Sequence, residues 1–151
     1  MSSWEPKEML IWCQTHPALS SKYTETVCTG AVELGNSQLL RLYPLVLRGL
    51  GSDARHKKWS VITAQVKKTT KDNRPESWRI NNDSIEFIER YKDTGDNRRG
   101  KELFDPQNIY EGVEHVEFEQ KRVKTSMAIV EAKLISAEIK KQTPGEEKKW
   151  L

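Results

Sequence analysis

The chain has 151 residues, the size of one ordinary domain, and a net charge of only +3. Hydrophobic residues make up 36% of it and charged residues 31%, with a mean hydropathy of −0.76, and its five Trp, four Tyr and three Phe exclude a mainly disordered chain. No run approaches the ~18 apolar residues of a membrane span, and the N-terminus lacks the long apolar stretch of a signal peptide. We therefore expect a cytoplasmic protein with no membrane partner.

The charge is spread unevenly along the sequence. Residues 37–80 hold ten Lys and Arg against three Asp and Glu, whereas residues 81–119 hold five against eleven. A basic block attracts nucleic acid, because each phosphate that it neutralises releases counterions. The alternative is a solvated surface on which the basic and acidic blocks pair with each other, and the charge pattern favours neither.

Two strands are predicted in the first part of the chain. Residues 9–13 form a short run with apolar side chains on both faces, which predicts a strand covered on both sides. Residues 25–34 form the second strand, and Gly30 within it indicates a bulge or a close backbone approach. Gly35 and Asn36 then predict a hairpin turn.

The two cysteines, Cys13 and Cys28, fall in these two strands. No CxxC pair and no Cys/His cluster accompanies them, which argues against a zinc site. Their apolar surroundings are typical of buried free thiols, although they could approach each other if the strands pair. We expect no cofactor.

The third strand is predicted over residues 38–43 and should end at Pro44. Its alternation places Leu40 and Leu42 on one face and Arg41 and Tyr43 on the other. Arg and Tyr side by side on a strand can stack on bases or sugars, which makes both candidates for binding nucleic acid. The alternative is an Arg packed over a Tyr at a solvent edge.

Residues 59–68 predict a fourth strand, and a basic loop over residues 67–79 follows it. Pro75 fixes its own φ and favours an extended Arg74. Arg74 and Arg79 can bind phosphate through two hydrogen bonds each, and Trp78 offers a stacking face. In the alternative, Glu76 pairs with an Arg and Trp78 covers the end of a barrel. The candidate nucleic-acid-binding residues are Arg41, Tyr43, Lys67, Lys68, Lys71, Arg74, Trp78 and Arg79.

The rest of the chain predicts fewer elements. Residues 84–91 alternate as a fifth strand, with a helix as the alternative, and residues 93–101 read as a polar loop. Asp105 and Pro106 predict the start of the main helix, as its N-cap and first residue. Residues 127–139 predict one or two strands. We expect one β-rich domain over residues 1–142 and a charged tail over residues 143–151.

No catalytic signature is present. His16, His56 and His115 have no nucleophile at a recognisable motif spacing, and no Gly-rich phosphate loop occurs. A metal-dependent nuclease built from dispersed acidic residues leaves little local signature, so this enzyme class stays a third alternative.

Several sequence runs resemble a family of uncharacterised bacterial proteins. They are Ile11-Trp12-Cys13-Gln14-Thr15-His16-Pro17, the run from Ser21 to Gly30, Leu40-Arg41-Leu42-Tyr43-Pro44, and the run from Lys68 to Arg79. The order and spacing of the strands are also similar to the dual OB-containing family. That second resemblance implies nucleic-acid binding and a setting near mobile-element and defence genes.

Taken together, the pattern predicts an α+β, mostly β fold, namely a small, strongly curved antiparallel sheet or OB-like barrel with one main helix. The first functional hypothesis is a non-catalytic module that binds single-stranded DNA or RNA. The alternative is a protein-interaction subunit of a larger bacterial assembly.

Overall fold

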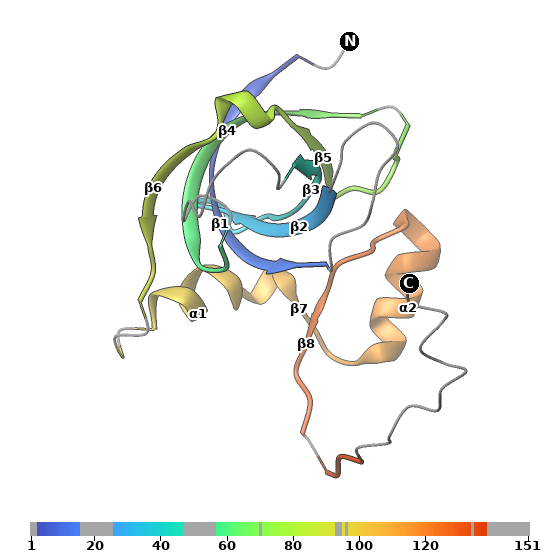
Figure 1. Cartoon of the computed structure of the whole chain (residues 1–151). Helices are drawn as coiled ribbons and strands as arrows, with labels where there is room; N and C mark the ends of the chain where they lie inside the picture. The colour runs from blue at the N-terminus through green and yellow to red at the C-terminus, as the bar shows by residue number, and fades with distance from the viewer. Residues whose placement is uncertain are drawn as a thin grey trace, which may run out of the picture.

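The structure, a computed structural model, describes residues 3–15, 26–46, 57–69, 71–92, 95, 97–133 and 135–138. Its centre is a ring of five strands: β1 (Glu5–Gln14), β2 (Thr26–Glu33), β3 (Leu39–Val46), β4 (Ser60–Lys68) and β5 (Ser77–Ile80). The strand order is β1-β2-β3-β5-β4, and β4 pairs back with β1, so the ring is closed (Figure 1). The predicted fold class, an α+β, OB-like barrel, is confirmed.

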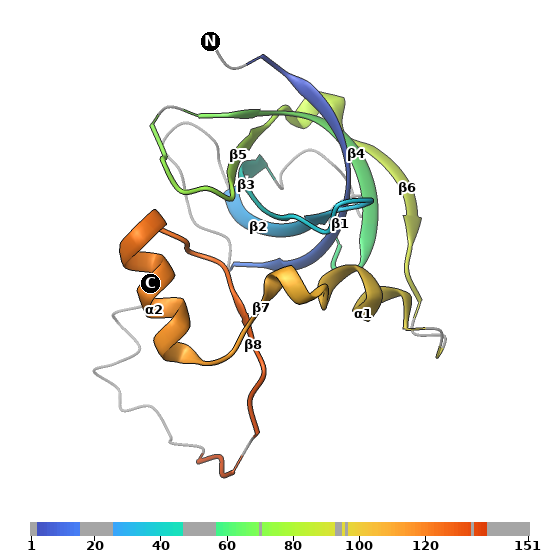
Figure 2. The same cartoon turned by 180° about the vertical axis from the view of Figure 1, so that it is seen from behind.

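The remaining elements lie outside the barrel. η2 (Asn82–Ser84) and β6 (Glu86–Arg90) continue from β5, and β6 pairs with the edge of β4 that faces away from β1. α1 (Arg98–Leu103) runs across the lower end of the barrel in Figures 1 and 2, and η3 (Pro106–Asn108) follows it. β7 (Ile109–Tyr110), α2 (Val113–Val123) and β8 (Ile129–Val130) stand to one side, with β7 and β8 paired in parallel.

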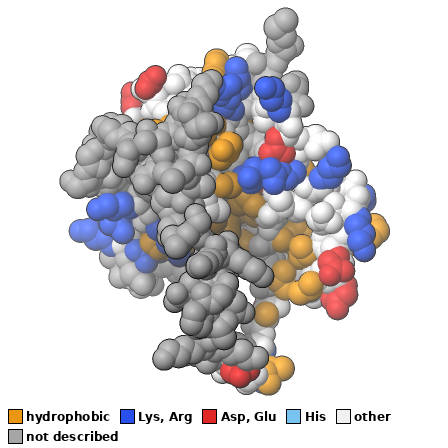
Figure 3. Space-filling view, turned by 45° about the vertical axis from the view of Figure 1, so that its right-hand side comes forward, with side chains coloured by type: hydrophobic (Ala, Val, Ile, Leu, Met, Phe, Trp, Pro, Cys, Tyr) orange, Lys and Arg blue, Asp and Glu red, His pale blue; other side chains and the backbone are white. Residues whose placement is uncertain are grey.

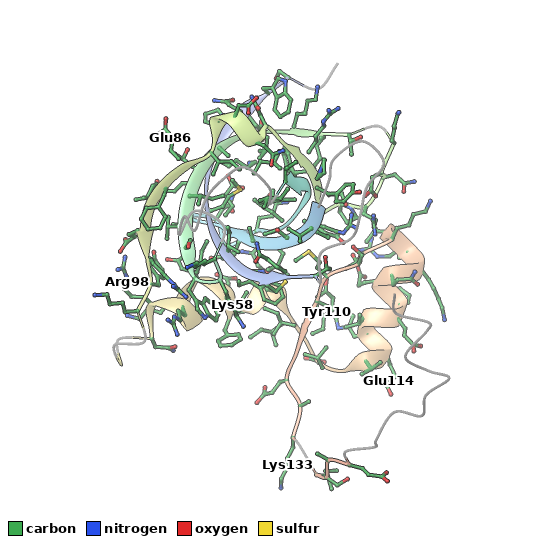
Figure 4. All side chains as sticks on the ribbon, in the orientation of Figure 1. Lys58, Glu86, Arg98, Tyr110, Glu114 and Lys133 are labelled. Carbon is green, nitrogen blue, oxygen red and sulfur yellow. The ribbon has the colours of Figure 1, made fainter. Side chains whose placement is uncertain are left out.

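The side chains labelled in Figure 4 help to locate the elements outside the barrel. Tyr110 lies in β7 and Glu114 in the first turn of α2, and Lys133 projects from the segment after β8, far from the barrel (Figure 4). Within the described residues, no helix is both long enough and apolar enough to cross a membrane.

One face of each barrel strand fills the barrel interior. Leu40 and Leu42, which were predicted to share one face of β3, are fully buried, and so is Ile62 of β4. Alternation produces this result because successive side chains of a strand point to opposite faces of the sheet. The interior contains Met9, Ile11, Val27, Ala31, Leu40, Leu42, Leu45, Ile62, Ala64, Val66, Trp78, Ile80 and Ile85.

A second apolar cluster covers part of the outer wall of the barrel. It joins Leu10, Val32, Leu39 and Val61 to Tyr91 and to Leu103 of α1. Leu10 is as fully buried as Met9 and Ile11 on either side of it. The apolar character of both faces of residues 9–13 is therefore explained by a core on each side of β1.

Two boundary predictions in the barrel need correction. The third strand does not end at Pro44, because β3 continues to Val46 through a cis Tyr43–Pro44 peptide bond. Residues 77–79 belong to β5 and not to a loop, because Trp78 and Ile80 alternate into the interior. The strand over residues 84–91 is confirmed as β6, and the helix alternative is wrong.

The helical predictions were misplaced. The Asp105 carboxylate accepts a hydrogen bond from Gln107 N at 3.0 Å, but it caps the short η3, and the main helix α2 begins after Gly112. Residues 98–103 form α1, although a polar loop was expected there. Of residues 127–139, only Ile129 and Val130 form a strand among those that the structure describes.

The close approach predicted at Gly30 is confirmed. A Cβ there would lie 2.4 Å from Cys13 Sγ and 3.1 Å from Met127 Cε. The pairing register shifts on either side, between Ile11 and Cys13 in β1 and between Val27 and Thr29 in β2. The bulges therefore lie beside Gly30, and the missing side chain makes room for Cys13.

We predict that Gly30→Ala destabilises the barrel by about 1–3 kcal/mol, because the added methyl group overpacks the contact with Cys13. Urea unfolding followed by circular dichroism measures the change. The cost should shrink in a Cys13→Ala background, which removes the sulfur. Gly112→Ala is the control, since its Cβ would meet only the flexible Glu114 carboxylate, at 3.1 Å. An equal cost in both backgrounds would show that the contact with sulfur is not the cause.

Candidate nucleic-acid interface

A groove of about 400 Å³ lies between β3 and the loop that joins β4 to β5. We call it the loop groove. Its walls are Arg41, Tyr43, Pro44, Thr69, Lys71, Asp72, Arg74, Ser77, Trp78 and Arg79. Six of the eight residues predicted from the sequence therefore meet at one place: Arg41, Tyr43, Lys71, Arg74, Trp78 and Arg79.

The parallel pairing of β3 with β5 brings these distant segments together. It sets Arg41 opposite Ser77 and Leu42 opposite Trp78. Arg41 N also donates a hydrogen bond to Glu76 O at 2.7 Å, which fixes the end of the loop against β3. Because alternation sends Leu42 inward, Arg41 and Tyr43 face outward into the loop groove.

Asp72 is the electrostatic centre of the groove. Its Oδ2 accepts hydrogen bonds from Arg41 Nη1 at 3.1 Å and from Arg74 Nη2 at 2.6 Å, and its Oδ1 accepts one from Arg74 Nε at 2.8 Å. The hydrogen bonds from the Arg74 side chain are the main reason that the pKa of Asp72 lies well below its usual range. Asp72 thus stays ionised and orients two guanidinium groups.

Two further cations of the groove are exposed to solvent. Lys71 and Arg79 form no ion pair within the described part of the chain. Tyr43 lies beside them with 48% of its surface exposed. On the face that carries the β4–β5 loop, Lys and Arg side chains are interleaved with hydrophobic ones (Figure 3). Such a surface can contact phosphate groups and stack on a base at the same time.

The structure corrects the role expected of Trp78. Its side chain belongs to the barrel interior and is only 9% exposed, with Lys68 Nζ 4.3 Å and Lys7 Nζ 4.7 Å from the centre of the ring. These ammonium groups occupy the positions that a stacked base would need. Trp78 therefore closes the end of the barrel, which was the alternative, and Tyr43 is the exposed aromatic side chain of the groove.

Lys67 and Lys68 do not line the loop groove. Lys67 Nζ lies 4.6 Å from the centre of the Trp4 ring. Lys68 Nζ donates a hydrogen bond to Pro75 O, and desolvation lowers the pKa of Lys68. Neither residue is among those that line the loop groove, and their part in nucleic-acid binding stays a prediction.

The roles of Asp72 and Glu76 were not predicted from the sequence. Asp72 lies two residues before Arg74 in a turn-forming segment, and its side chain also accepts the Arg74 N–H at 3.3 Å, a local signal that could have been read. Glu76 was expected to pair with an Arg in the alternative. It is instead 6% exposed and accepts hydrogen bonds from Ser126 N and Ser126 Oγ. No sequence signal links residues 50 positions apart.

Metal-binding side chains do not gather in the described part of the chain. There, no group of three or more His, Cys, Asp or Glu residues is placed to hold a metal ion. Cys13 and Cys28 are free thiols, and burial raises the pKa of both.

The fold and the groove define a small OB-like β-barrel with a basic groove on its outer wall. The chain belongs to the family of the domain of unknown function DUF8758, whose model matches residues 5–106. Comparisons with curated proteins and with solved structures give no match. The matched range contains the barrel, β6 and α1, whereas α2 and β8 lie beyond it.

We predict that Asp72 contributes stability that depends on pH. Because its folded pKa is lowered, the contribution is complete above the unfolded value of roughly 4 and is lost as the pH falls through the folded pKa. Urea unfolding from about pH 7 to pH 2 should show wild type losing its advantage over Asp72→Asn below about pH 4. Glu86→Gln, at an exposed position of β6, is the control for general charge effects. A constant difference between wild type and Asp72→Asn would contradict the pairing.

Proposed function

We propose that the protein is a non-catalytic module that binds single-stranded DNA or RNA in the loop groove. The observation that carries the proposal is the meeting of Arg41, Lys71, Arg74 and Arg79 with exposed Tyr43 in one groove. OB-type barrels bind oligonucleotides through the face of β2 and β3 and through the β1–β2 and β4–β5 loops. The loop groove shares β3 and the β4–β5 loop with this location, and β5 supplies the rest of its described lining.

The charge of the groove supports phosphate as the main ligand group. Four cationic side chains line it against one carboxylate, Asp72. Asp72 holds Arg41 and Arg74 in place, and a phosphate oxygen can accept from the N–H groups that Asp72 leaves free, because a guanidinium carries five donors. Lys71 and Arg79 then add charge without first breaking an ion pair with any residue in the described ranges.

The aromatic side chain supports a single strand over a duplex. Tyr43 can stack only on a base whose face is open, and the bases of a duplex are stacked on each other. The setting in a bacterial defence or mobile-element system is part of the proposal and rests on the sequence resemblance alone.

We predict that Lys71→Ala/Arg79→Ala weakens binding to an oligonucleotide of about 12 nucleotides, a length within the site size of OB-type binders. Fluorescence polarisation at several salt concentrations measures the effect. If each side chain neutralises one phosphate, the slope of log K against log salt becomes shallower by about 1.4. Lys101→Ala/Lys133→Ala is the matched control, since it removes the same charge from α1 and from the segment after β8. Equal losses in both double variants would refute a specific groove.

We further predict that Tyr43→Ala lowers the affinity for single strands by the equivalent of one stacked base, about 1–3 kcal/mol. Tyr43→Phe should keep most of the affinity because the ring remains. Duplex affinity should change little in either variant. If Tyr43→Ala lowers single-strand and duplex affinity alike, stacking is not the role of this ring.

A second candidate, docking on another protein, is favoured by α2. Val113 and Phe118 are each 61% exposed, and none of the residues of this helix is buried. Co-purification of a stoichiometric protein that is lost in Val113→Ser/Phe118→Ser, from a chain with no affinity for single strands, would favour this candidate over the first.

A further inference from the structure

A second cavity, of about 410 Å³, lies on the outer wall of the barrel. Its lining comes from the end of β1, from β2 and β3, and from the segment that follows α2: Trp12, Cys13, Gln14, Thr15, Cys28, Gly30, Arg41, Ser126, Met127 and Ala128. We call residues 124–128 the strap and this cavity the strap pocket. The strap lies beyond the residues that match the family, 5–106.

The strap is held firmly against the barrel. The buried Glu76 carboxylate accepts a hydrogen bond from Ser126 N at 2.5 Å and another from Ser126 Oγ. Met127 packs at the position above Gly30 and joins Trp12 at the edge of the outer apolar cluster. Beyond the strap, β8 pairs with β7. The strap side of the strap pocket is thus held by hydrogen bonds from Ser126 to Glu76 and by the packing of Met127 against Trp12 and Gly30.

Arg41 joins the strap pocket to the loop groove. Its side chain lines both cavities, and in the sheet it lies opposite Gly30 of β2 and Ser77 of β5. Its guanidinium is anchored to Asp72 Oδ2 at 3.1 Å, on the side of the loop groove. A ligand in the loop groove and a ligand in the strap pocket would therefore be separated only by the Arg41 side chain.

The two cavities differ in chemistry. Among the described residues, Arg41 is the one charged side chain that lines the strap pocket, whereas five charged ones line the loop groove. The strap pocket offers the flat indole of Trp12 and the flexible thioether of Met127, with Gln14 and Thr15 as hydrogen-bonding groups. Apolar walls with a few polar groups suit a planar, uncharged heterocycle with hydrogen-bonding edges, and do not suit a phosphate.

We propose that the strap pocket takes one nucleobase of the strand whose phosphates lie in the loop groove. This inference rests on the proposed function and deepens it: Arg41 lies between the phosphate contacts and the base, and the strap encloses the base. The ligand is then a strand with at least one unpaired base.

The two cysteines allow a direct test, because Cys13 and Cys28 are half-buried and both line the strap pocket. Full-length protein is alkylated with iodoacetamide alone, with an oligonucleotide of about 12 nucleotides, or with a fully abasic strand of equal length. Each ligand is used at a concentration that direct binding shows to be saturating. Mass spectrometry follows each thiol separately.

The oligonucleotide should suppress alkylation, and the abasic strand should bind and leave both thiols reactive. Equal protection by both strands, or by neither while both bind, would overturn the inference. Protection by a free nucleoside monophosphate but not by the oligonucleotide would also overturn it. Absence of binding by either strand is a different outcome, since it removes the proposed function itself.

A substitution that fills the strap pocket with a larger side chain gives an independent test. Ala128→Leu should lower oligonucleotide affinity by about fivefold to 100-fold, the equivalent of one stacked base, and leave abasic affinity unchanged. Ile135→Trp is the control, because Ile135 is 91% exposed and does not line the cavity. Circular dichroism checks that both variants fold. Equal weakening of both strands by Ala128→Leu would place the base elsewhere.

Discussion

The parallel pairing of β3 with β5 is the constraint on which the rest of the structure depends. It closes the ring of five strands, since β5 otherwise pairs only with β4 among the described strands. The same pairing sends Leu42 and Trp78 into the interior and sets Arg41 opposite Ser77, where both line the loop groove. The β3–β5 pairing thus holds together both the core and the loop groove. A change that separates β3 from β5 also separates the walls of the groove.

The second organising feature is the balance of charge around Asp72. Close cations repel each other, and one carboxylate that accepts from both Arg41 and Arg74 lets them converge without that cost. The groove keeps a positive surplus because Lys71 and Arg79 have no such partner in the described residues. We therefore regard the loop as pre-organised: the guanidinium groups are oriented before a ligand arrives.

The sequence predicted the features that follow from local periodicity. The alternation of β3 placed Leu40 and Leu42 on one face and Arg41 and Tyr43 on the other, and the density of Lys and Arg marked the loop. The four residues of β5 were missed because a strand so short carries almost no periodic signal. The stacking role predicted for Trp78 failed for another reason: its burial depends on closure of the barrel, which local periodicity does not encode. The carboxylate of Glu76 reaches Ser126 only through tertiary packing, which no local pattern encodes.

The central claim is that a single strand binds at the wall formed by β3, β5 and the loop that joins β4 to β5. Amide shifts in a ¹⁵N–¹H NMR titration with unlabelled single-stranded DNA test it most directly, because they report every described element in one experiment. We predict the largest shifts in β3, in β5 and in the loop that joins β4 to β5. We predict none in β6 or α1, which lie outside the loop groove. Shifts confined to β6, α1 or α2, or no shifts at low salt, would contradict it.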